Sequence, residues 1–356
     1  MAQKEQEILV SSGAGLGAAV GVEGEGGGAP GYDDQEAVRA RGYWELVWRR
    51  FRRDKVAIAS GIFIILLILV AFVGAPIAKH FVGHGPDDIF TGTAAVDSVS
   101  LLPANPWTHI DNYYTNKQNI LVLGAANRLG QDEFLRLLYG ARVSLEVALL
   151  STFGVMVIGV ILGSIAGYFR GWSDTIISRV TEVTMAFPLL LFIVALAATV
   201  GPQLDNITFG GIFPNGVVTL VLIFTIFGWF YPARIMRAQV LSIREKEYIE
   251  AARMIGASDS RIIKSHVLPH LIAPMIVYST LIVASYVLFE AGLSFLGLGI
   301  KPPTASWGNL LSDAPQYYTT RPLLMVWPGL AVLLTTLAFN LLGDGLRDSF
   351  DPRSSN

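Results

Sequence analysis

The sequence EAARMIGASDSRIIKSHVLP, at residues 250–269, is a charged, helix-forming segment that lies between two long apolar runs. Residues 245–254 contain good helix formers without Pro or Gly, and Gly256 suits the left-handed residue just past a helix end. Ser258 can cap a second helix, which Pro269 is expected to end. The pattern therefore predicts two short helices joined by a glycine turn. A membrane protein keeps such a folded loop between its spans mainly to contact another protein.

The composition of the 356-residue chain indicates an integral membrane protein. Hydrophobic residues make up 52% of it and charged residues 15%, and the mean hydropathy is +0.51. By comparison, about a quarter of an ordinary soluble domain is charged. The net charge of -2 says nothing about nucleic acid, but no basic patch with a nucleic-acid-binding motif occurs, so no nucleic-acid partner is expected. The chain has no cysteine, so disulfides, thiolate chemistry and cysteine-ligated metals are excluded within it.

Six apolar runs are long enough to cross a bilayer, which takes roughly 20 mostly apolar residues. They lie at residues 56–78, 143–169, 181–200, 217–233, 271–293 and 323–343. The fourth is the least regular, since Pro232 and Arg234 are expected to close it early. The sequence thus predicts an all-α integral membrane protein with six transmembrane helices.

The segment before the first run divides into a tail and a helix. Residues 1–38 are Gly-rich and bury too little apolar surface to fold, so we predict a disordered cytoplasmic tail. No signal-peptide pattern is present, and the run at 56–78 is expected to be an uncleaved anchor. One face of a helix over residues 39–55 would carry the large apolar side chains of Trp44, Val47, Trp48 and Phe51. Arginines cover the other face, which favours an amphipathic helix at the membrane interface over a plain topogenic charge cluster.

The distribution of Lys and Arg predicts the orientation, because cytoplasmic loops carry an excess of both. Residues 39–55 hold seven of them and the loop at 234–270 another seven, whereas 201–216 holds none and 294–322 only two. Both termini and the 234–270 loop are therefore placed in the cytoplasm. The expected units are a first transmembrane helix at 56–78, an extracytoplasmic segment at 79–142, a five-helix core at 143–346 that contains the 234–270 loop, and a cytoplasmic C-terminus at 347–356.

Residues 250–269 resemble the EAA loop of ABC importer permeases. The pattern of that loop is Glu-Ala-Ala, three residues, Gly, nine residues, Ile, any residue and Leu-Pro. The matching residues are Glu250, Ala251, Ala252, Gly256, Leu268 and Pro269. His266 stands where the general pattern has Ile, and an ending in His, a hydrophobic residue and Leu-Pro resembles the peptide-importer branch.

Three further stretches resemble the second permease of oligopeptide and dipeptide importers. They are GQDEFLRLLYGARVSL at 130–145, LSFLGLGIKPPTASWGNLLSDA at 293–314 and GDGLRDSFDPR at 343–353. The likeness covers about residues 43–353, and the tail at 1–38 has no counterpart. Two short motifs depart from the family: Ala-Ala-Asn at 125–127 replaces Gly-Thr-Asp, and Gly-Gln-Asp at 130–132 replaces Gly-Arg-Asp.

The resemblance implies the type I ABC importer permease fold and a multi-pass location in the bacterial cell membrane. It also implies a heterodimer with a homologous permease, two cytoplasmic subunits that bind ATP and Mg, and an outside substrate-binding protein that delivers di- or oligopeptides. Motion of the loop at 250–256 would couple ATP binding to opening of the permease pair. The coupling surface would consist of Glu250, Ala251, Ala252, Gly256, Leu268 and Pro269.

The chain lacks motifs for its own energy source. It has no GxxxxGK followed by Ser or Thr and no HExxH, so we expect a pore-forming subunit without an ATPase site or a cofactor. Gly163 and Gly167 lie in an apolar run and are expected to mark close helix packing. Glu290 is the clearest acid inside a run and a candidate for the translocation path, although holding neighbouring backbone or a partner subunit is equally open. Glu146 and Glu182 lie at the edges of runs and can reach the interface.

Two smaller features have a structural and a functional interpretation. His80 and His84 are spaced to ligate a metal from one helix face, but Gly83 weakens such a helix and no carboxylate triad lies nearby, so no metal site is expected. Three prolines fall inside the predicted spans, namely Pro188, Pro274 and Pro328. They are either tolerated kinks or hinges for alternating access, and the sequence does not choose between these.

Other functions stay open at this point. The same architecture could import nickel or another small solute, which the outside partner and an uptake assay would distinguish. An ion-coupled secondary transporter would work alone under an ion gradient, and the lack of a buried acidic constellation argues against it. A membrane enzyme is disfavoured, because no nucleophile, base and metal set converges on one face.

Overall fold

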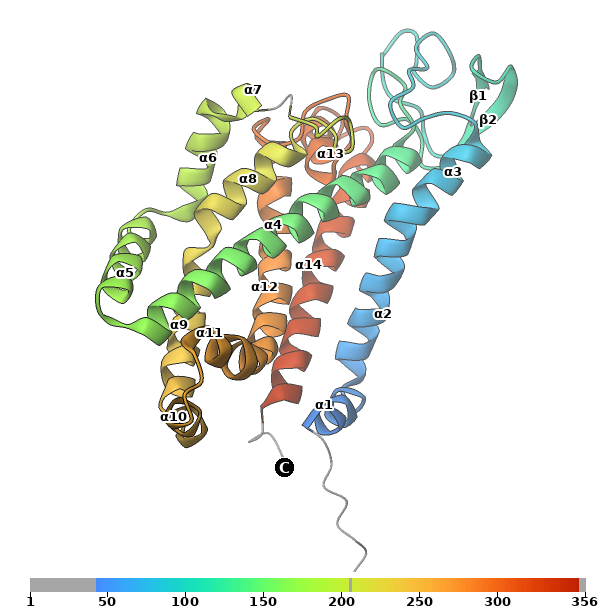
Figure 1. Ribbon diagram of the computed structural model, residues 1–356. Helices are drawn as coiled ribbons and strands as arrows, with labels where there is room; N and C mark the ends of the chain where they lie inside the picture. Colours follow the sequence, from blue (N-terminus) through green and yellow to red (C-terminus); the bar gives the residue numbers. More distant parts are fainter. Residues whose placement is uncertain (1–42, 205–206, 352–356) are drawn as a thin grey trace, which may run out of the picture. The chain divides into compact units, whose positions relative to one another are not determined.

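The structure, a computed structural model, describes residues 43–204 and 207–351. The predicted tail at 1–38, the first residues of the predicted interfacial helix and residues 352–356 lie outside the described ranges. Within them the chain is mostly helical (Figure 1). The helices are α1 Tyr43–Phe51, α2 Lys55–Leu69, η1 Val70–Gly74, α3 Ala75–Val82, α4 Glu133–Phe169, α5 Gly171–Met185, α6 Leu189–Thr199, α7 Gly201–Leu204, α8 Val217–Gly228, α9 Phe230–Arg244, α10 Glu247–Met254, α11 Asp259–Ile262, η2 Ile263–Val267, α12 Leu268–Phe295, α13 Trp307–Asp313, η3 Ala314–Gln316 and α14 Leu323–Phe350.

Four helices are long and apolar enough to cross a membrane. They are Lys55–Val82, Glu133–Phe169, Asp259–Phe295 and Leu323–Phe350. Two bent pairs pass the same test together: α5 with α6, at 82°, and α8 with α9, at 42°. The predicted six spans are therefore reached if each bent pair counts as one span.

The third and fourth predicted spans differ from the expectation of simple helices. The run at 181–200 is broken between Met185 and Leu189, because Pro188 disfavours helical backbone in the residue before it. The early end expected at Pro232 and Arg234 is wrong, since α9 runs on to Arg244. Pro232 falls in the first turn of α9, where its missing N–H has no intrahelical partner to lose.

The remaining prolines inside spans do not break their helices. Pro274 lies within α12 and Pro328 within α14, and both helices continue past them.

In the first span, Asp54 caps α2 by accepting hydrogen bonds from the backbone N–H groups of Val56 and Ala57, at 2.9 and 3.0 Å. These contacts fix where the apolar helix begins.

α1 packs against the end of α14. The ring of Trp44 meets that of Phe350 edge-on at 6.0 Å, and the guanidinium of Arg50 donates to the carbonyl of Asp351 at 2.7 Å. Val47 is buried, whereas Trp48 is 60% exposed. The apolar face of α1 is thus divided between α14 and the surroundings, and a position at the membrane interface stays a prediction.

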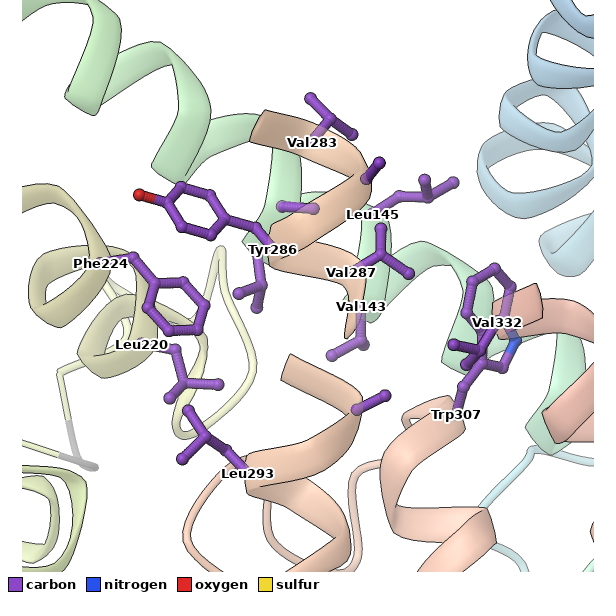
Figure 2. Close-up of a cluster of buried hydrophobic side chains, with 14 of the residues drawn as sticks. Val143, Leu145, Leu220, Phe224, Val283, Tyr286, Val287, Leu293, Trp307 and Val332 are labelled. Carbon is purple, nitrogen blue, oxygen red and sulfur yellow. The ribbon is translucent and has the colours of Figure 1, made fainter. Parts of the chain in front are cut away.

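α4 lies among the other long helices and forms the centre of the packing (Figure 1). The main hydrophobic core joins α4, α8, α12 and α13, with Leu145, Phe224, Tyr286 and Trp307 among its members (Figure 2). The rings of Phe224 and Tyr286 are stacked with their centroids 4.8 Å apart.

Glycines allow α4 and α9 to touch through their backbones. A Cβ on Gly163 would lie 2.5 Å from the carbonyl oxygen of Ala233, and one on Gly167 would lie 2.8 Å from that of Arg237. Such distances leave no room for any side chain at these two positions. The close packing predicted for this glycine pair is confirmed.

Between the first two long helices lie the two β-strands of the described part of the chain. β1 Thr108–Asn112 pairs antiparallel with β2 Lys117–Leu121, and Ile110 stands opposite Asn119. Phe90, Ile110 and Leu121 form a small core beneath this hairpin. α4 then begins at Glu133, ten residues before the apolar run, because Asp132 caps it through the N–H groups of Phe134 and Leu135.

Candidate functional site: the α10 knob

The predicted loop at 250–269 contains a compact knob, formed by α10 and the turn that follows it, residues 247–258. α10 ends at Met254, and Gly256 has a φ of +83°, the left-handed conformation expected of it. No atom lies within 4 Å of a Cβ built on Gly256, so this position needs glycine for its backbone and not for space. The N–H of Ala257 bonds to the carbonyl of Ala252 at 3.0 Å and closes the turn.

The second predicted helix is not a separate short helix. α11 passes through the π turn η2 directly into α12, so the prediction that Pro269 ends it is wrong. A proline normally clashes with the carbonyl four residues earlier, but the π turn just before Pro269 shifts the hydrogen bonding to five residues. Ser258 occupies the capping position, although its side chain makes no capping hydrogen bond.

The Glu-Ala-Ala sequence is divided between two faces of α10. Ala252 is buried with Ile249 in a cluster that also contains Ile262, Val267 and Leu271. Glu250 and Ala251 face outward, as do Gly256 and Pro269, while Leu268 is half-buried. Of the two alanines assigned to the predicted coupling surface, only Ala251 faces outward, and Ala252 packs the knob against the helices behind it.

Two large apolar side chains of the knob are almost fully exposed. Met254 is 83% exposed and Ile255 is 86% exposed, directly beside Gly256. Sequence reasoning missed both, although two large apolar residues next to a turn glycine were a usable signal. Exposed apolar side chains gathered at one place are typical of surfaces that contact a protein or a membrane.

The end of α4 holds the knob in place through Tyr168. Its hydroxyl donates to a carboxylate oxygen of Asp259 at 2.7 Å. The guanidinium carbons of Arg253 and Arg244 lie 5.3 and 5.9 Å from the centre of its ring. Cation–π contacts of this kind add to the packing. Tyr168 thus connects α4 to α9, α10 and α11.

A second connection joins α10 to the beginning of α12. The ring of Tyr248 stacks on that of His270 with centroids 5.7 Å apart. His270 Nδ1 donates to the carbonyl of His266 at 2.6 Å. Together with the buried cluster, these contacts connect α10 to α4, α9 and α12.

Glu290 is separate from the knob and fully buried. The hydroxyls of Ser144 in α4 and Ser294 in α12 donate to its two oxygens at 2.6 and 2.7 Å. The N–H of Ile300 in turn donates to Ser294 Oγ at 3.0 Å. Because Glu290 reaches no surface of the described chain, its geometry favours the second interpretation, that it holds neighbouring elements together.

The two histidines of the outer segment are not paired. Gly83, with φ +77°, ends α3, so His84 lies beyond the helix that carries His80. The N–H of Tyr114 donates to Asn112 Oδ1 at 2.9 Å, which turns the Asn112 amide nitrogen towards His84 Nδ1, 3.2 Å away. His84 Nε2 then donates to Asp132 at 3.1 Å. Both ring nitrogens are thus engaged, and within the described ranges no group of three potential metal ligands occurs.

Arg136 is a further buried residue that sequence reasoning missed. One nitrogen of its guanidinium donates to a carboxylate oxygen of Asp87 at 3.0 Å and to the carbonyl of Pro303 at 3.2 Å. Partial burial raises the pKa of Asp87, and the charge of Arg136 opposes that rise.

In the same segment, hydrogen bonds from Ser100 and from the Val99 N–H hold the pKa of Asp97 below its ordinary value.

Comparison with known proteins identifies the family. Residues 159–356 match the family described as binding-protein-dependent transport system inner membrane component, and residues 42–94 match the N-terminal TM domain of oligopeptide transport permease C.

Two curated relatives extend over most of the chain. The glutathione transport system permease protein GsiD of Pectobacterium atrosepticum is 36% identical over 311 residues, 87% of this chain and 91% of that protein. The dipeptide transport system permease protein DppC of Alkalihalophilus pseudofirmus is 34% identical over 312 residues, 87% of this chain and 90% of that protein. A solved structure of the MetNI methionine ABC transporter aligns with a TM-score of 0.45 and 18% identity, over 60% of this chain and 97% of that one.

The two curated relatives each cover 87% of the chain, and the family match at 159–356 includes the α10 knob. The chain therefore belongs to the family of inner membrane components of binding-protein-dependent transport systems.

Proposed function

We propose that this chain is the transmembrane permease subunit of an ATP-driven ABC importer of di- and oligopeptides. Relatives at 34% and 36% identity are named as permeases for a dipeptide and for glutathione, which is itself a small peptide. The observation that carries the mechanism is the α10 knob, with Met254 and Ile255 exposed beside Glu250. The imported peptide would reach the permease from a substrate-binding protein.

The knob is the proposed contact for an ATP-binding subunit. Covering Met254 and Ile255 would remove both side chains from water, and burial of one such side chain is worth about 1.5 to 3 kcal/mol. Glu250 and Ala251 lie on the same outward side, and Gly256 fixes the turn between them and α11. ATP and Mg would be bound by two partner subunits, and this chain supplies no group to the hydrolysis.

Motion of the knob would reach the membrane through its fixed contacts. Tyr168 and the buried cluster around Ile249 connect α10 to α4, α9 and α12. ATP binding would move the knob and open the paired permeases outward, and hydrolysis would return them inward. The chain thus acts as a two-state element biased by a ligand on another subunit. The second, homologous permease would complete the pathway.

The orientation is part of the proposal. α1, α10 and the end of α14 lie at the same end of the long helices (Figure 1). α1 and α10 belong to the segments at 39–55 and 234–270 that are rich in Lys and Arg. The excess of positive charge in cytoplasmic loops supports placing this end, and both termini, in the cytoplasm.

Uptake in a strain that lacks the chain tests the transport function. Labelled dialanine, a longer peptide and nickel are offered separately, before and after the gene is restored. We expect peptide uptake to return only with the gene. Restored nickel uptake without peptide uptake would assign the chain to metal import. Transport by the purified chain alone in liposomes under an ion gradient would contradict the ATP-driven mechanism.

A further inference from the structure

A polar cavity lies between α5 and α9, next to the breaks in both bent helix pairs. Its volume is about 240 Å³. The polar and sulfur-containing side chains around it are Ser178, Thr181, Glu182, Met185, Arg234 and Arg237. In secondary transporters, interrupted membrane helices commonly mark the place where the substrate binds. The coupling role of the α10 knob does not account for this cavity.

The cavity lies within the length of the membrane-spanning helices. Gly159 of α4 packs on Pro232, and Gly163 packs on the backbone of Ala233 and Arg237, so Arg234 lies level with this part of α4. α4 continues beyond Gly163 for about 9 Å, at 1.5 Å per residue, before it ends at Phe169. Arg234 is exposed on this face of the chain, and charged side chains on membrane-spanning helices face a cavity or a partner group.

Two of the charged groups at the cavity have partners in the chain. Arg237 forms a two-point ion pair with Asp174, at 2.5 and 2.8 Å. Glu182 pairs with Arg179 at 2.8 Å. Arg234 differs, because its guanidinium contacts the sulfur of Met185 at 3.8 Å and no carboxylate of the described residues lies within ion-pair distance of it. The cavity therefore has one positive charge in excess.

We infer that Arg234 binds the carboxylate of the peptide that passes through the permease. A guanidinium presents parallel N–H donors that match a carboxylate. The hydroxyls of Ser178 and Thr181 already donate to Asp174 and to the carbonyl of Ile177, so their remaining lone pairs can accept from peptide N–H groups. This inference rests on the proposed function, since it names the part of a peptide that the cavity takes.

The test compares Arg234→Gln and Arg234→Lys with wild type in cells that contain the complete importer. Initial uptake is measured for dialanine and for its C-terminal amide, and each variant is compared with wild type on the same compound. Arg128→Gln is the matched control, because Arg128 is exposed in the outer segment. Purification of the complex from the same cells measures retention of the partner permease.

Arg234→Gln should lower dialanine uptake by about ten- to a hundredfold, the effect of losing one charged hydrogen-bond partner. The lysine variant should keep part of the uptake, and Arg128→Gln should keep all of it. Where wild type imports the amide, Arg234→Gln should import it at the wild-type rate. Where wild type does not import the amide, the test rests on dialanine alone, and dialanine uptake should fall in the order wild type, Arg234→Lys, Arg234→Gln.

Unchanged dialanine uptake in Arg234→Gln, or equal losses for the acid and the amide, would overturn the inference. Loss of the partner permease from the Arg234→Gln complex would also overturn it, because the counter-ion would then belong to another subunit. Failure of the wild-type importer to take up any peptide would instead refute the proposed function.

Discussion

Truncating the two exposed side chains of the α10 knob should separate folding of the permease from binding of the ATP-binding subunit. Met254 and Ile255 are 83% and 86% exposed, so Met254→Ala and Ile255→Ala should each change the stability of the isolated chain by less than about 0.5 kcal/mol. If the partner covers both, the double variant should lose about 2 to 4 kcal/mol of binding free energy. At about 1.4 kcal/mol per factor of ten, the dissociation constant should rise roughly 30- to 700-fold.

The assay titrates purified ATP-binding subunit onto the permease pair in lipid nanodiscs and measures the bound fraction. Val99→Ala is the control, because Val99 is 92% exposed in the outer segment and should leave binding unchanged. An unchanged dissociation constant in the double variant would refute the reasoning. An equal loss in the Val99 variant would show that the effect is not specific to the knob.

Three further substitutions or conditions follow from the packing and the hydrogen bonds. Gly163→Ala should abolish folded permease, because the added Cβ would lie 2.5 Å from a backbone oxygen of α9. Gly292→Ala should be tolerated, because open space surrounds Gly292. The yield of monodisperse protein after gel filtration measures both effects. Glu290→Gln should keep near-normal peptide uptake, since an amide can still bond to the two serine hydroxyls. Glu290→Leu should lower the folded yield, because it leaves both hydroxyls unpaired. Loss of uptake by a well-folded Glu290→Gln variant would instead favour a role of Glu290 in the translocation path. The folded pKa of Asp97 lies below the ordinary value of 3.8. The hydrogen bonds that Asp97 accepts should therefore stabilise the segment fully above pH 3.8 and be lost as the pH falls through the lower folded pKa. Hydrogen exchange should show faster local opening in acid, and opening that is independent of pH would contradict this.

The sequence predicted the helical membrane class and the turn at Gly256, because apolar length and a left-handed glycine depend on local chemistry alone. Helix breaks were harder to predict. An apolar run has the same composition whether it is straight or bent, so the 82° turn at Pro188 and the continuation of α9 through Pro232 were not visible. Whether a proline breaks a helix depends on its position in that helix, which the sequence left uncertain.

The helix and glycine turn of the knob were predicted from the sequence, but the side chains that face outward were predicted only in part. The pattern around Glu250 identified the loop, but not which side of α10 packs inward, since that is decided by Tyr168 and other residues distant in sequence. Ala252 was therefore assigned to the surface, and Ile255 was overlooked. Glu290 was recognised as unusual, while its serine partners come from elements that only the fold brings together.

Cross-linking from the tip of the knob tests the coupling contact itself. The chain has no native cysteine, so Ile255→Cys and Val99→Cys each introduce its only thiol. Membranes that contain the complete importer are treated with a photoactivatable maleimide, and adducts are detected with antibody to the ATP-binding subunit. We predict a cross-link from position 255 whose yield changes when ATP is added, and none from position 99. An intact importer that gives no adduct from position 255 would contradict the assignment of the α10 knob as the coupling surface.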